Sequence, residues 1–285
     1  MGLLYFPVRH ILTCNLFLEN YNYYYNSFLG TEVPHFETRG AVFVPNQQIK
    51  ATMKPLGDSA LIVQLGEGMD PAIHEKVKNL SELLTNNPFE GFIELVPAYN
   101  NITVYYNPYT VHMSQMGTST AFLKVCTHMN HLVEQIKINK NESPRLVSIP
   151  VCYGGEFGPD LENVAQYNKM TPEEVIRIHS ESECLVYMLG FAPGFPFMGG
   201  MDTRIATPRK ETPRLTIPPG SVGIAGKQTG IYPLETPGGW QIIGRTPLDL
   251  FLPQMSPPTL LQSGDIIKFT PISPSKYLEY KEMKQ

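Results

Sequence analysis

Cysteine is scarce in this sequence, with only four residues among 285. The four are widely separated, and none forms a CxxC pair or a Cys/His pair at the spacing of metal ligands. This pattern argues against a zinc site and against a disulfide framework. We expect the cysteines to be buried, reduced thiols of a cytoplasmic protein. They are Cys14, Cys126, Cys152 and Cys184.

Long apolar runs and a strong charge of one sign are also missing. No stretch of about 18 or more uncharged apolar residues occurs, which excludes an ordinary transmembrane helix. The net charge is -4, whereas nucleic-acid-binding proteins carry a basic patch. We therefore expect a soluble protein that has no metal-ligand residues of its own and has neither a membrane nor nucleic acid as a partner.

The first part of the chain has the pattern of an α+β domain. Asp70 and Pro71 supply an N-cap and a first-turn proline, and apolar residues then recur at helical spacing. A second amphipathic helix follows after two strands. The order strand, helix, strand, strand, helix is a split α+β pattern of the ferredoxin-like kind. The expected strands are 59–65, 92–98 and 101–106, and the expected helices are 70–86 and 122–136.

The second part of the chain has a different pattern, with mostly short strands and turns in place of amphipathic helices. Residues 137–144, KINKNESP, are polar and end in proline, so we place the domain boundary there. Thr171 and Glu174 have capping-box spacing and start a short helix. Beyond it we expect only short strands and turns, which at regular spacing indicate a closed or nearly closed β-barrel. The expected strands are 146–153, 185–189, 215–217, 222–225, 240–244, 248–251 and 266–270.

The segment 190–245 is dense in glycine and proline. Such a segment cannot form long helices, because proline lacks the backbone donor and glycine has the largest backbone entropy cost. Hairpin turns of a β domain would account for these residues alone. However, the turns also carry cations, an amide, a carboxylate and aromatic side chains, and loops on a rigid scaffold are where binding groups tend to lie. We interpret the segment as a shaped polar binding surface.

Three motifs in this segment resemble one bacterial family. GFAPGFPFMGGMD, TPRKETPRLTIPPGSVGIAGKQTGIYP and ETPGGWQIIGRTP are similar to the family that contains the 5-oxoprolinase B subunit, the histidine-kinase inhibitor KipI and proteins labelled allophanate hydrolase subunit 1. The resemblance extends more weakly from about Met53 to about Ile272. It implies the α+β fold class, with a ferredoxin-like domain at 53–140 followed by a cyclophilin-like β-barrel domain of the carboxyltransferase C/D type at 145–285.

The residues before Met53 fall outside this resemblance. They are poor in charge and include a run of tyrosine and asparagine from Tyr21 to Asn26. Arg9 and His10 interrupt the apolar stretch that a signal peptide would need. We interpret residues 1–52 as an atypical N-terminal extension, untranslated or disordered, and favour Met53 over Met1 as the start.

The resemblance also implies an activity. A family member of the 5-oxoprolinase type works with subunits A and C as an ATP-dependent enzyme, which hydrolyses 5-oxo-L-proline to L-glutamate, with ATP and magnesium as the implied cofactors. Two alternatives stay open. One is a KipI-like inhibitor that binds a sporulation histidine kinase, and the other is a carboxyltransferase-like subunit of a urea or allophanate pathway enzyme. We expect a cytoplasmic protein that is inactive alone.

Three residues are the expected catalytic groups: His179, Lys227 and Gln228. His179 ends the short helix, where a capping or core histidine is the alternative interpretation. Lys227 and Gln228 lie in GIAGKQTG, which lacks both the upstream glycine and the Ser/Thr of a phosphate loop, so a turn that carries them into a pocket is the functional interpretation.

The expected substrate- or phosphate-binding residues combine cations with aromatic walls. Arg209, Lys210 and Arg214 surround two prolines and would form a stiff platform for a carboxylate or phosphate, unless they are ordinary surface charges. Trp240 could stack on a flat ligand or fill the barrel. The expected binding residues are Phe191, Pro193, Gly194, Arg209, Arg214, Glu235, Trp240 and Arg245.

Overall fold

The computed structural model describes residues 51–114, 119–137 and 144–283, which form two compact units. The first unit ends at Ser143 and the second begins at Pro144. The predicted extension at 1–52 falls almost wholly outside the described residues, as does Cys14, so these predictions stay predictions. Among the described residues, no helix is long and apolar enough to cross a membrane. Cys126, Cys152 and Cys184 are buried free thiols, as expected.

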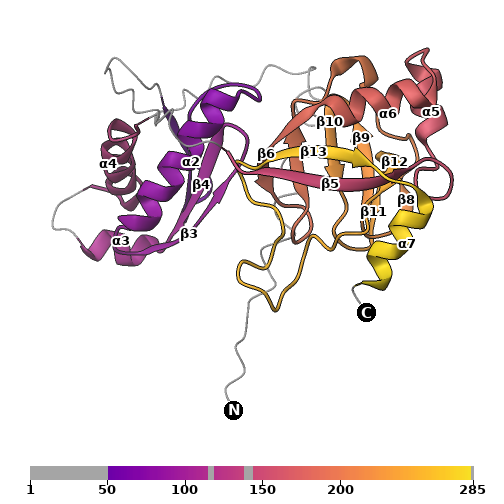
Figure 1. Cartoon of the computed structure of the whole chain (residues 1–285). Coiled ribbons are helices and arrows are strands. Elements are labelled where there is room, and N and C mark those ends of the chain that lie inside the picture. The colour runs from indigo at the N-terminus through magenta and orange to yellow at the C-terminus, as the bar shows by residue number, and fades with distance from the viewer. Residues whose placement is uncertain (1–50, 115–118, 138–143, 284–285) are drawn as a thin grey trace. The chain divides into compact units, whose positions relative to one another are not determined.

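The first unit is a four-stranded antiparallel sheet with helices packed against it (Figure 1). The strand order is β1-β2-β4-β3, and each strand pairs with its neighbours in antiparallel register. The strands are β1 (Thr52–Pro55), β2 (Ala60–Gln64), β3 (Phe92–Pro97) and β4 (Asn101–Tyr106), and the helices are α2 (Pro71–Asn86), α3 (Pro108–Ser114) and α4 (Ala121–Glu134).

Local signals explain why these elements form. The Asp70 side chain accepts a hydrogen bond from the Ala72 backbone N–H at 2.7 Å and caps α2, with Pro71 in its first turn. Leu80 of α2 and Val104 of β4 are fully buried in one core between helices and sheet. The predicted α+β pattern is confirmed. Its edge strand β1 precedes β2 in the chain, whereas a ferredoxin-like order would place a C-terminal strand there.

The second unit is a closed barrel of seven strands in the order β10-β7-β6-β13-β5-β12-β9. Only the β5–β13 pair is parallel among these strands as described. A separate two-stranded ribbon pairs β8 (Arg214–Ile217) with β11 (Thr236–Gly238). The barrel strands are β5 (Leu146–Tyr153), β6 (Glu183–Leu189), β7 (Pro196–Gly199), β9 (Ser221–Ala225), β10 (Gln228–Ile231), β12 (Gln241–Arg245) and β13 (Ile266–Pro271).

The barrel interior is a packed apolar core, as the β-barrel prediction requires. Every barrel strand contributes at least one buried side chain to a single cluster, so this cluster must occupy the inside of the closed sheet. Helices α5 (Leu161–Tyr167) and α6 (Pro172–Glu181) add to the same core through Val164 and Ile178. One core residue from each strand can be named: Val151, Val186, Met198, Val222, Ile231, Ile243 and Phe269.

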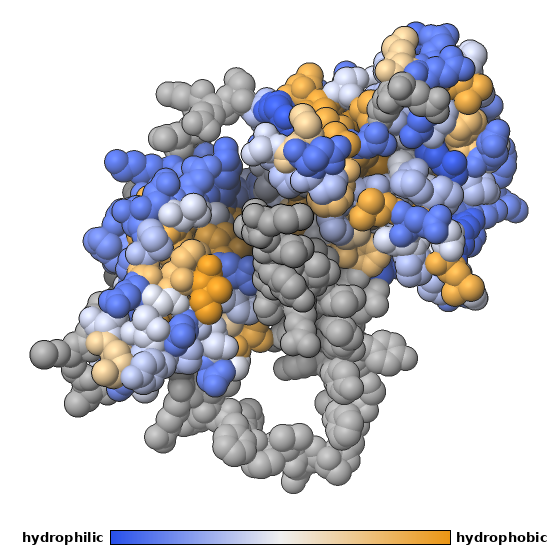
Figure 2. Space-filling view, turned by 90° about the horizontal axis from the view of Figure 1, so that it is seen from below, coloured by the Kyte–Doolittle hydropathy of each residue, from blue (hydrophilic) through white to orange (hydrophobic). Residues whose placement is uncertain are grey.

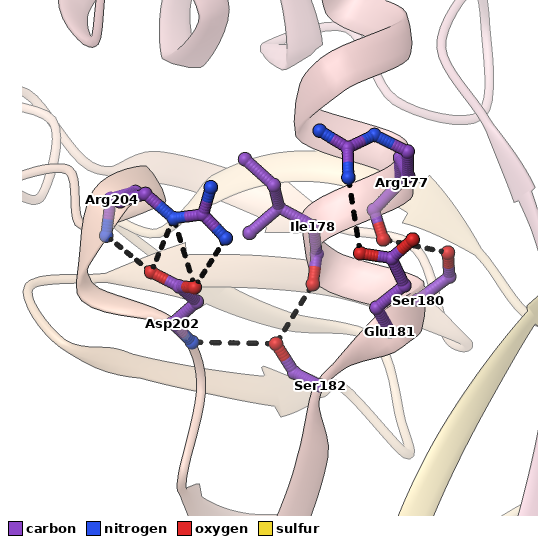
Figure 3. A network of polar contacts seen from close by, with 7 residues as sticks. All are labelled: Arg177, Ile178, Ser180, Glu181, Ser182, Asp202 and Arg204. Atoms are coloured by element: carbon purple, nitrogen blue, oxygen red, sulfur yellow. Dashed lines mark hydrogen bonds and ion pairs between the residues drawn. The ribbon is translucent and has the colours of Figure 1, made fainter.

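Helix α6 is held at both ends by polar contacts. At its start, Thr171 and Glu174 form the predicted capping box. At its end, the Ser182 hydroxyl donates to the Ile178 carbonyl and accepts from the backbone N–H of Asp202, whose carboxylate binds Arg204 (Figure 3). These bonds connect the short 3-10 helix η2 (Thr203–Ile205) to the point where the chain enters β6.

Several elements differ from the sequence-based expectation. The predicted strand at 248–251 is wrong, because only Phe251 makes a single bridge, with Thr259. Pro247 and Pro253 flank this segment and cannot donate to a strand ladder. The helices α3, α5 and α7 (Pro274–Glu282) were not predicted. Each is short, and α7 buries only Tyr277, which leaves little apolar periodicity to detect.

Apolar side chains also remain on the surface. Figure 2 shows hydrophobic residues in orange interspersed with hydrophilic residues in blue on one face of the molecule. Among the residues that the structure describes, the most exposed large apolar side chain is Leu215 of β8, at 90%. Single exposed apolar residues are normal on protein surfaces, so they do not by themselves locate a partner.

Candidate functional site

A cluster of aromatic side chains covers the outer face of β10. Ile231 belongs to the interior core and Thr229 bonds to a buried histidine, so both point inward. Successive side chains of a strand alternate, and Gly230 therefore faces outward. A Cβ atom on Gly230 would lie 2.9 Å from the rings of both Phe195 and Trp240. Trp240 thus packs on the outside of the barrel and does not fill it.

The aromatic cluster is rigid. Phe195 is at its centre, with ring centroids 5.5 Å from Trp240, 5.3 Å from Tyr232 and 4.9 Å from Phe197. The contacts to Trp240 and Tyr232 are edge-to-face, a favourable arrangement of aromatic quadrupoles. Phe191 reaches the same cluster, 6.5 Å from Tyr232, and is only half-buried. Phe195, Tyr232 and Trp240 are themselves buried, so the edge of this apolar wall at the half-buried Phe191 is the part that a ligand could contact.

The loop that carries Phe191 is held in an unusual backbone conformation. Phe191 has φ 70, and the left-handed region costs a residue with a side chain about 1 kcal/mol. The loop is closed by hydrogen bonds from Gly190 N to Phe195 O and from Phe195 N to Ala192 O. Such outliers occur often at ligand sites. Gly194 has φ 81, and a Cβ atom at this position would lie 3.1 Å from the Leu250 carbonyl oxygen. The glycine therefore allows the loop to pack closely against the Leu250 backbone.

Tyr232 connects the aromatic wall to two arginines. Burial raises the pKa of Tyr232 to about 12, while the charge of Arg209, a hydrogen bond from the Trp240 backbone N–H and the charge of Arg214 act in the opposite direction. Both arginines are therefore close enough to the phenol to affect its ionisation. Arg209 is exposed, whereas Arg214 is half-buried. A solvent-facing cation beside an apolar wall is an arrangement suited to a small carboxylate ligand.

The loop that carries Arg209 is fastened on both sides of that residue. The Gln241 side-chain amide donates to the Pro208 carbonyl at 3.0 Å. The Lys210 backbone N–H donates to the Gly239 carbonyl at 2.7 Å. The position of the Arg209 backbone is therefore set by the segment 239–241, which also contains Trp240.

The predicted anion platform is only partly available to a ligand. The guanidinium of Arg214 donates to both carboxylate oxygens of Asp160, at 2.7 and 2.8 Å, and the Lys210 ammonium donates to the same carboxylate at 3.0 Å. These two predicted anion-binding cations thus bind a carboxylate of the protein itself. The third of these cations, Arg209, is exposed.

His179 lies inside the barrel, and its exposed fraction is 0%. Its Nε2 is 2.9 Å from the Thr229 hydroxyl, which itself donates to the Gly223 carbonyl, so Nε2–H is the donor to Thr229. Its Nδ1, 2.8 Å from the Tyr153 hydroxyl, is then the acceptor. Burial lowers the pKa of His179 to about 3. These contacts suit a neutral structural histidine, and we infer a supporting role for it in place of acid–base catalysis.

This environment predicts acid-sensitive stability of the barrel. An unfolded histidine binds a proton below about pH 6.5, whereas folded His179 does so only near its pKa of about 3. Stability is therefore full above pH 6.5 and is lost as pH falls from 6.5 towards 3. We expect His179 to cost the native state on the order of 2 kcal/mol between pH 7 and pH 5.

Urea unfolding monitored by fluorescence tests this expectation, because the sequence contains a single tryptophan, Trp240, in the barrel unit. The variant His179→Gln should be less stable at pH 7 but should show a clearly weaker fall in stability between pH 7 and pH 5. An equal fall in both proteins would contradict the assignment.

The remaining predicted site residues are dispersed. Lys227 is exposed and Gln228 half-buried at the turn between β9 and β10, at the end of this hairpin opposite Tyr232. Glu235 is exposed in the connection between β10 and β11. Arg245 lies near Tyr277 of α7, where its charge lowers the pKa of Tyr277 against the larger effect of burial, which raises that pKa. The structure therefore brings Phe191, Trp240, Arg209 and Arg214 together around Tyr232, and places the other four elsewhere.

Two residues of this site were missed from the sequence. Asp160 stands in GGEFGPDL, which has the composition of an ordinary turn, and nothing local indicates its distant partners. Tyr232 occurs in GIYP, directly after β10, where an aromatic residue is typical of a strand end. Its position within the glycine- and proline-rich segment 190–245 was the signal that could have singled it out.

The part of the chain that the structure describes contains neither a cluster of metal ligands nor a phosphate loop. It contains no group of three or more His, Cys, Asp or Glu side chains that could hold a metal ion. GIAGKQTG forms the antiparallel β9–β10 hairpin, not the strand-to-helix turn of a phosphate loop. This motif therefore does not fit the phosphates of ATP in the way of a Walker site.

Comparisons with known proteins agree on one family. The family model described as the carboxyltransferase domain, subdomain C and D, matches residues 51–261. The 5-oxoprolinase B subunit of Bacillus subtilis (strain 168) is 52% identical over 236 residues, which are 82% of this chain and 98% of the relative. The 5-oxoprolinase B subunit of Escherichia coli O157:H7 is 39% identical over 217 residues, 76% of this chain and 94% of the relative.

A solved structure shows a similar fold within a longer chain. The crystal structure of TTHA0988 in space group P212121 is 32% identical, with a TM-score of 0.63. The match covers 75% of this chain and 40% of the TTHA0988 chain. The present chain thus spans about two fifths of that protein's length.

Proposed function

The chain belongs to the family of 5-oxoprolinase B subunits, and from this premise we propose that it works with subunits A and C in the ATP-dependent hydrolysis of 5-oxo-L-proline to L-glutamate. The observation that carries the proposal is the 52% identity to the Bacillus subtilis relative over 98% of that protein. A B subunit implies other 5-oxoprolinase subunits, so the working enzyme is a hetero-oligomer.

The chemistry sets clear demands on the assembled enzyme. The lactam of 5-oxoproline is an unstrained amide and a poor electrophile, so water does not open it readily. ATP, when bound in the complex, supplies a phosphoryl group that can activate the lactam oxygen as a leaving group. Water then adds at the carbonyl carbon and the ring C–N bond breaks, which leaves the phosphorylated carboxyl group of glutamate. A second water releases the phosphate, so that 5-oxoproline, ATP and two waters give glutamate, ADP and phosphate. The substrate must be held in one orientation throughout.

We assign the substrate-holding task to the aromatic and cationic surface around Tyr232. Arg209 would bind the carboxylate of 5-oxoproline through a charge-assisted, bidentate contact. Phe191 and Pro193 would pack against the CH2 groups of its ring, since they are the half-buried members of the adjacent loop. Arg214 and Trp240 would support this surface from below.

Fewer residues of this chain are assigned to binding the phosphates of ATP than to binding 5-oxoproline. GIAGKQTG does not form a phosphate loop, so binding of the ATP phosphates is not assigned to it. Lys227 and Gln228 remain candidates for a secondary contact, as an exposed cation and an amide on one hairpin turn. Substitution of both should then lower kcat/KM for 5-oxoproline less than substitution of Arg209.

Reconstitution tests the proposal. ATP-dependent release of glutamate from 5-oxoproline is measured with this chain plus subunits A and C, and with the same mixture lacking this chain. We expect turnover only in the complete mixture, and none without ATP. Equal turnover in both mixtures, with subunits A and C shown to be folded, would contradict the enzymatic role and would favour the histidine-kinase inhibitor.

A further inference from the structure

Phe191 is the central residue of a tight turn that residues with a side chain rarely form. The backbone N–H of Ala192 donates to the Gly190 carbonyl at 2.8 Å, and a hydrogen bond across this spacing defines a γ-turn. The φ of Phe191, 70, is that of the rare and strained form of this turn. Glycine would adopt the same φ without a steric penalty. The chain thus accepts backbone strain to keep an aromatic ring here, and such strain clusters at functional sites.

The loop around Phe191 has little room to shift and relieve this strain. The Gly190 N–H donates to the Phe195 carbonyl at 3.1 Å and closes the loop at its base. Behind the turn, Gly194 packs on the backbone of Leu250, whose carbonyl oxygen would lie 3.1 Å from a Cβ atom at position 194. The backbone of Phe191 is therefore fixed by its neighbours.

The Phe191 ring leans on aromatic side chains that are themselves fixed. Its centroid is 5.5 Å from that of Phe195 and 6.5 Å from that of Tyr232, with interplanar angles of 79° and 85°. Both partners are only 1% exposed. The Phe195 ring in turn packs directly on the backbone of Gly230, where a Cβ atom would lie 2.9 Å from it. Because this core is close-packed, a ligand that presses on Phe191 meets a wall that does not yield.

We propose that Phe191 is a specificity-determining residue of the 5-oxoprolinase reaction, which admits the bare CH2 groups of the lactam ring and excludes lactams with substituents on these carbons. The inference rests on the proposed function of this surface. Phe191 is half-buried, whereas Phe195 and Tyr232 are buried, so its exposed edge is the part of the wall that a ring can touch. One extra methylene in a rigid hydrophobic site changes kcat/KM by about 10- to 200-fold.

Two alternative substrates in the reconstituted enzyme test the inference. 3,3-Dimethyl-5-oxoproline carries a methyl group on each face of the lactam ring. We expect the wild-type enzyme to use it with a kcat/KM about 100-fold below that for 5-oxoproline. Phe191→Ala should lower kcat/KM for 5-oxoproline but raise it for the dimethyl lactam, so that the ratio of the two falls about 10-fold or more. The intrinsic difference in reactivity between the lactams cancels when variants are compared.

The outcomes separate the inference from its alternatives. A purely structural role of Phe191 would lower kcat/KM for both lactams by the same factor, and this unchanged ratio would overturn the inference. Equal use of both lactams by the wild-type enzyme would also overturn it. If Phe191→Ala does not fold, Phe191→Leu removes the ring with a smaller loss of packing, and the ratio should fall in the same direction. Failure of the proposed function itself would appear as wild-type turnover of 5-oxoproline that does not depend on this chain.

Phe157→Ala is the matched control. Phe157 is also a half-buried phenylalanine, but its described ring contact is with Tyr277 of α7, at 4.7 Å between centroids. Its substitution should leave the ratio of the two kcat/KM values as in the wild type. An equal fall in this ratio for Phe157→Ala and Phe191→Ala would show a general effect of losing a phenylalanine and would contradict the assigned role.

Discussion

Replacing Arg209 by glutamine is expected to lower kcat/KM for 5-oxoproline about 100-fold in the reconstituted enzyme, equivalent to about 2.7 kcal/mol of binding energy. A charge-assisted hydrogen bond to a carboxylate is worth about this much. The carboxylate of 5-oxoproline is not the reacting group, so the contact is the same in the ground state and the transition state. The loss should therefore appear as a higher KM with nearly unchanged kcat.

Arg204→Gln provides the control for this prediction. Arg204 is also an exposed arginine, and its described side-chain bonds go to Asp202 and not to the aromatic cluster. Steady-state kinetics should show wild-type KM for Arg204→Gln. A loss of kcat with unchanged KM in Arg209→Gln would contradict the assignment of Arg209 to the substrate carboxylate.

Gly158→Ala is expected to be the most damaging glycine-to-alanine substitution in the barrel unit, because its Cβ would make the shortest contact of the described glycines. A Cβ atom at Gly158 would lie 2.0 Å from the Ile243 carbonyl oxygen, which is backbone of β12 and cannot move aside alone. Strand β12 or the loop before Asp160 would have to shift. We expect a loss of roughly 3 kcal/mol in the free energy of unfolding, the upper end of the usual cost of overpacking.

Gly239→Ala is the matched control, because its Cβ would meet its nearest neighbour, the Lys210 carbonyl, at an ordinary 3.5 Å. Urea unfolding followed by Trp240 fluorescence should give a lower midpoint for Gly158→Ala, with an unchanged slope, and a near-normal midpoint for Gly239→Ala. Equal midpoints for the two variants would mean that the contact between the 158 loop and β12 is much looser than described.

The sequence predicted elements well where local chemistry and periodicity coincide. The capping box at Thr171 and the N-cap at Asp70 were identified because their partners are a few residues away. The barrel followed from the spacing of short strands. The short helices α5 and α7 were missed because one or two buried turns carry too little periodic signal.

The site was harder to predict because its contacts are long-range. The motif segment and the cluster of Phe191, Arg209 and Trp240 within it were identified by composition. Asp160 was missed, since its bonds reach Lys210 and Arg214, which lie 50 and 54 positions further along the chain. The same contacts changed the interpretation of Arg214 from a ligand-binding cation to a cation bound internally. Only the fold determines which charges meet.

The most direct test of this account is hydrogen–deuterium exchange of this chain within the reconstituted enzyme, with and without 5-oxoproline and a non-hydrolysable ATP analogue. We predict that ligand slows exchange in peptides covering 190–195, 207–214 and 232–241, while peptides covering α7 exchange as before. Protection confined to other parts of the chain, in an enzyme shown to be active, would contradict the claim that the surface around Tyr232 holds the substrate.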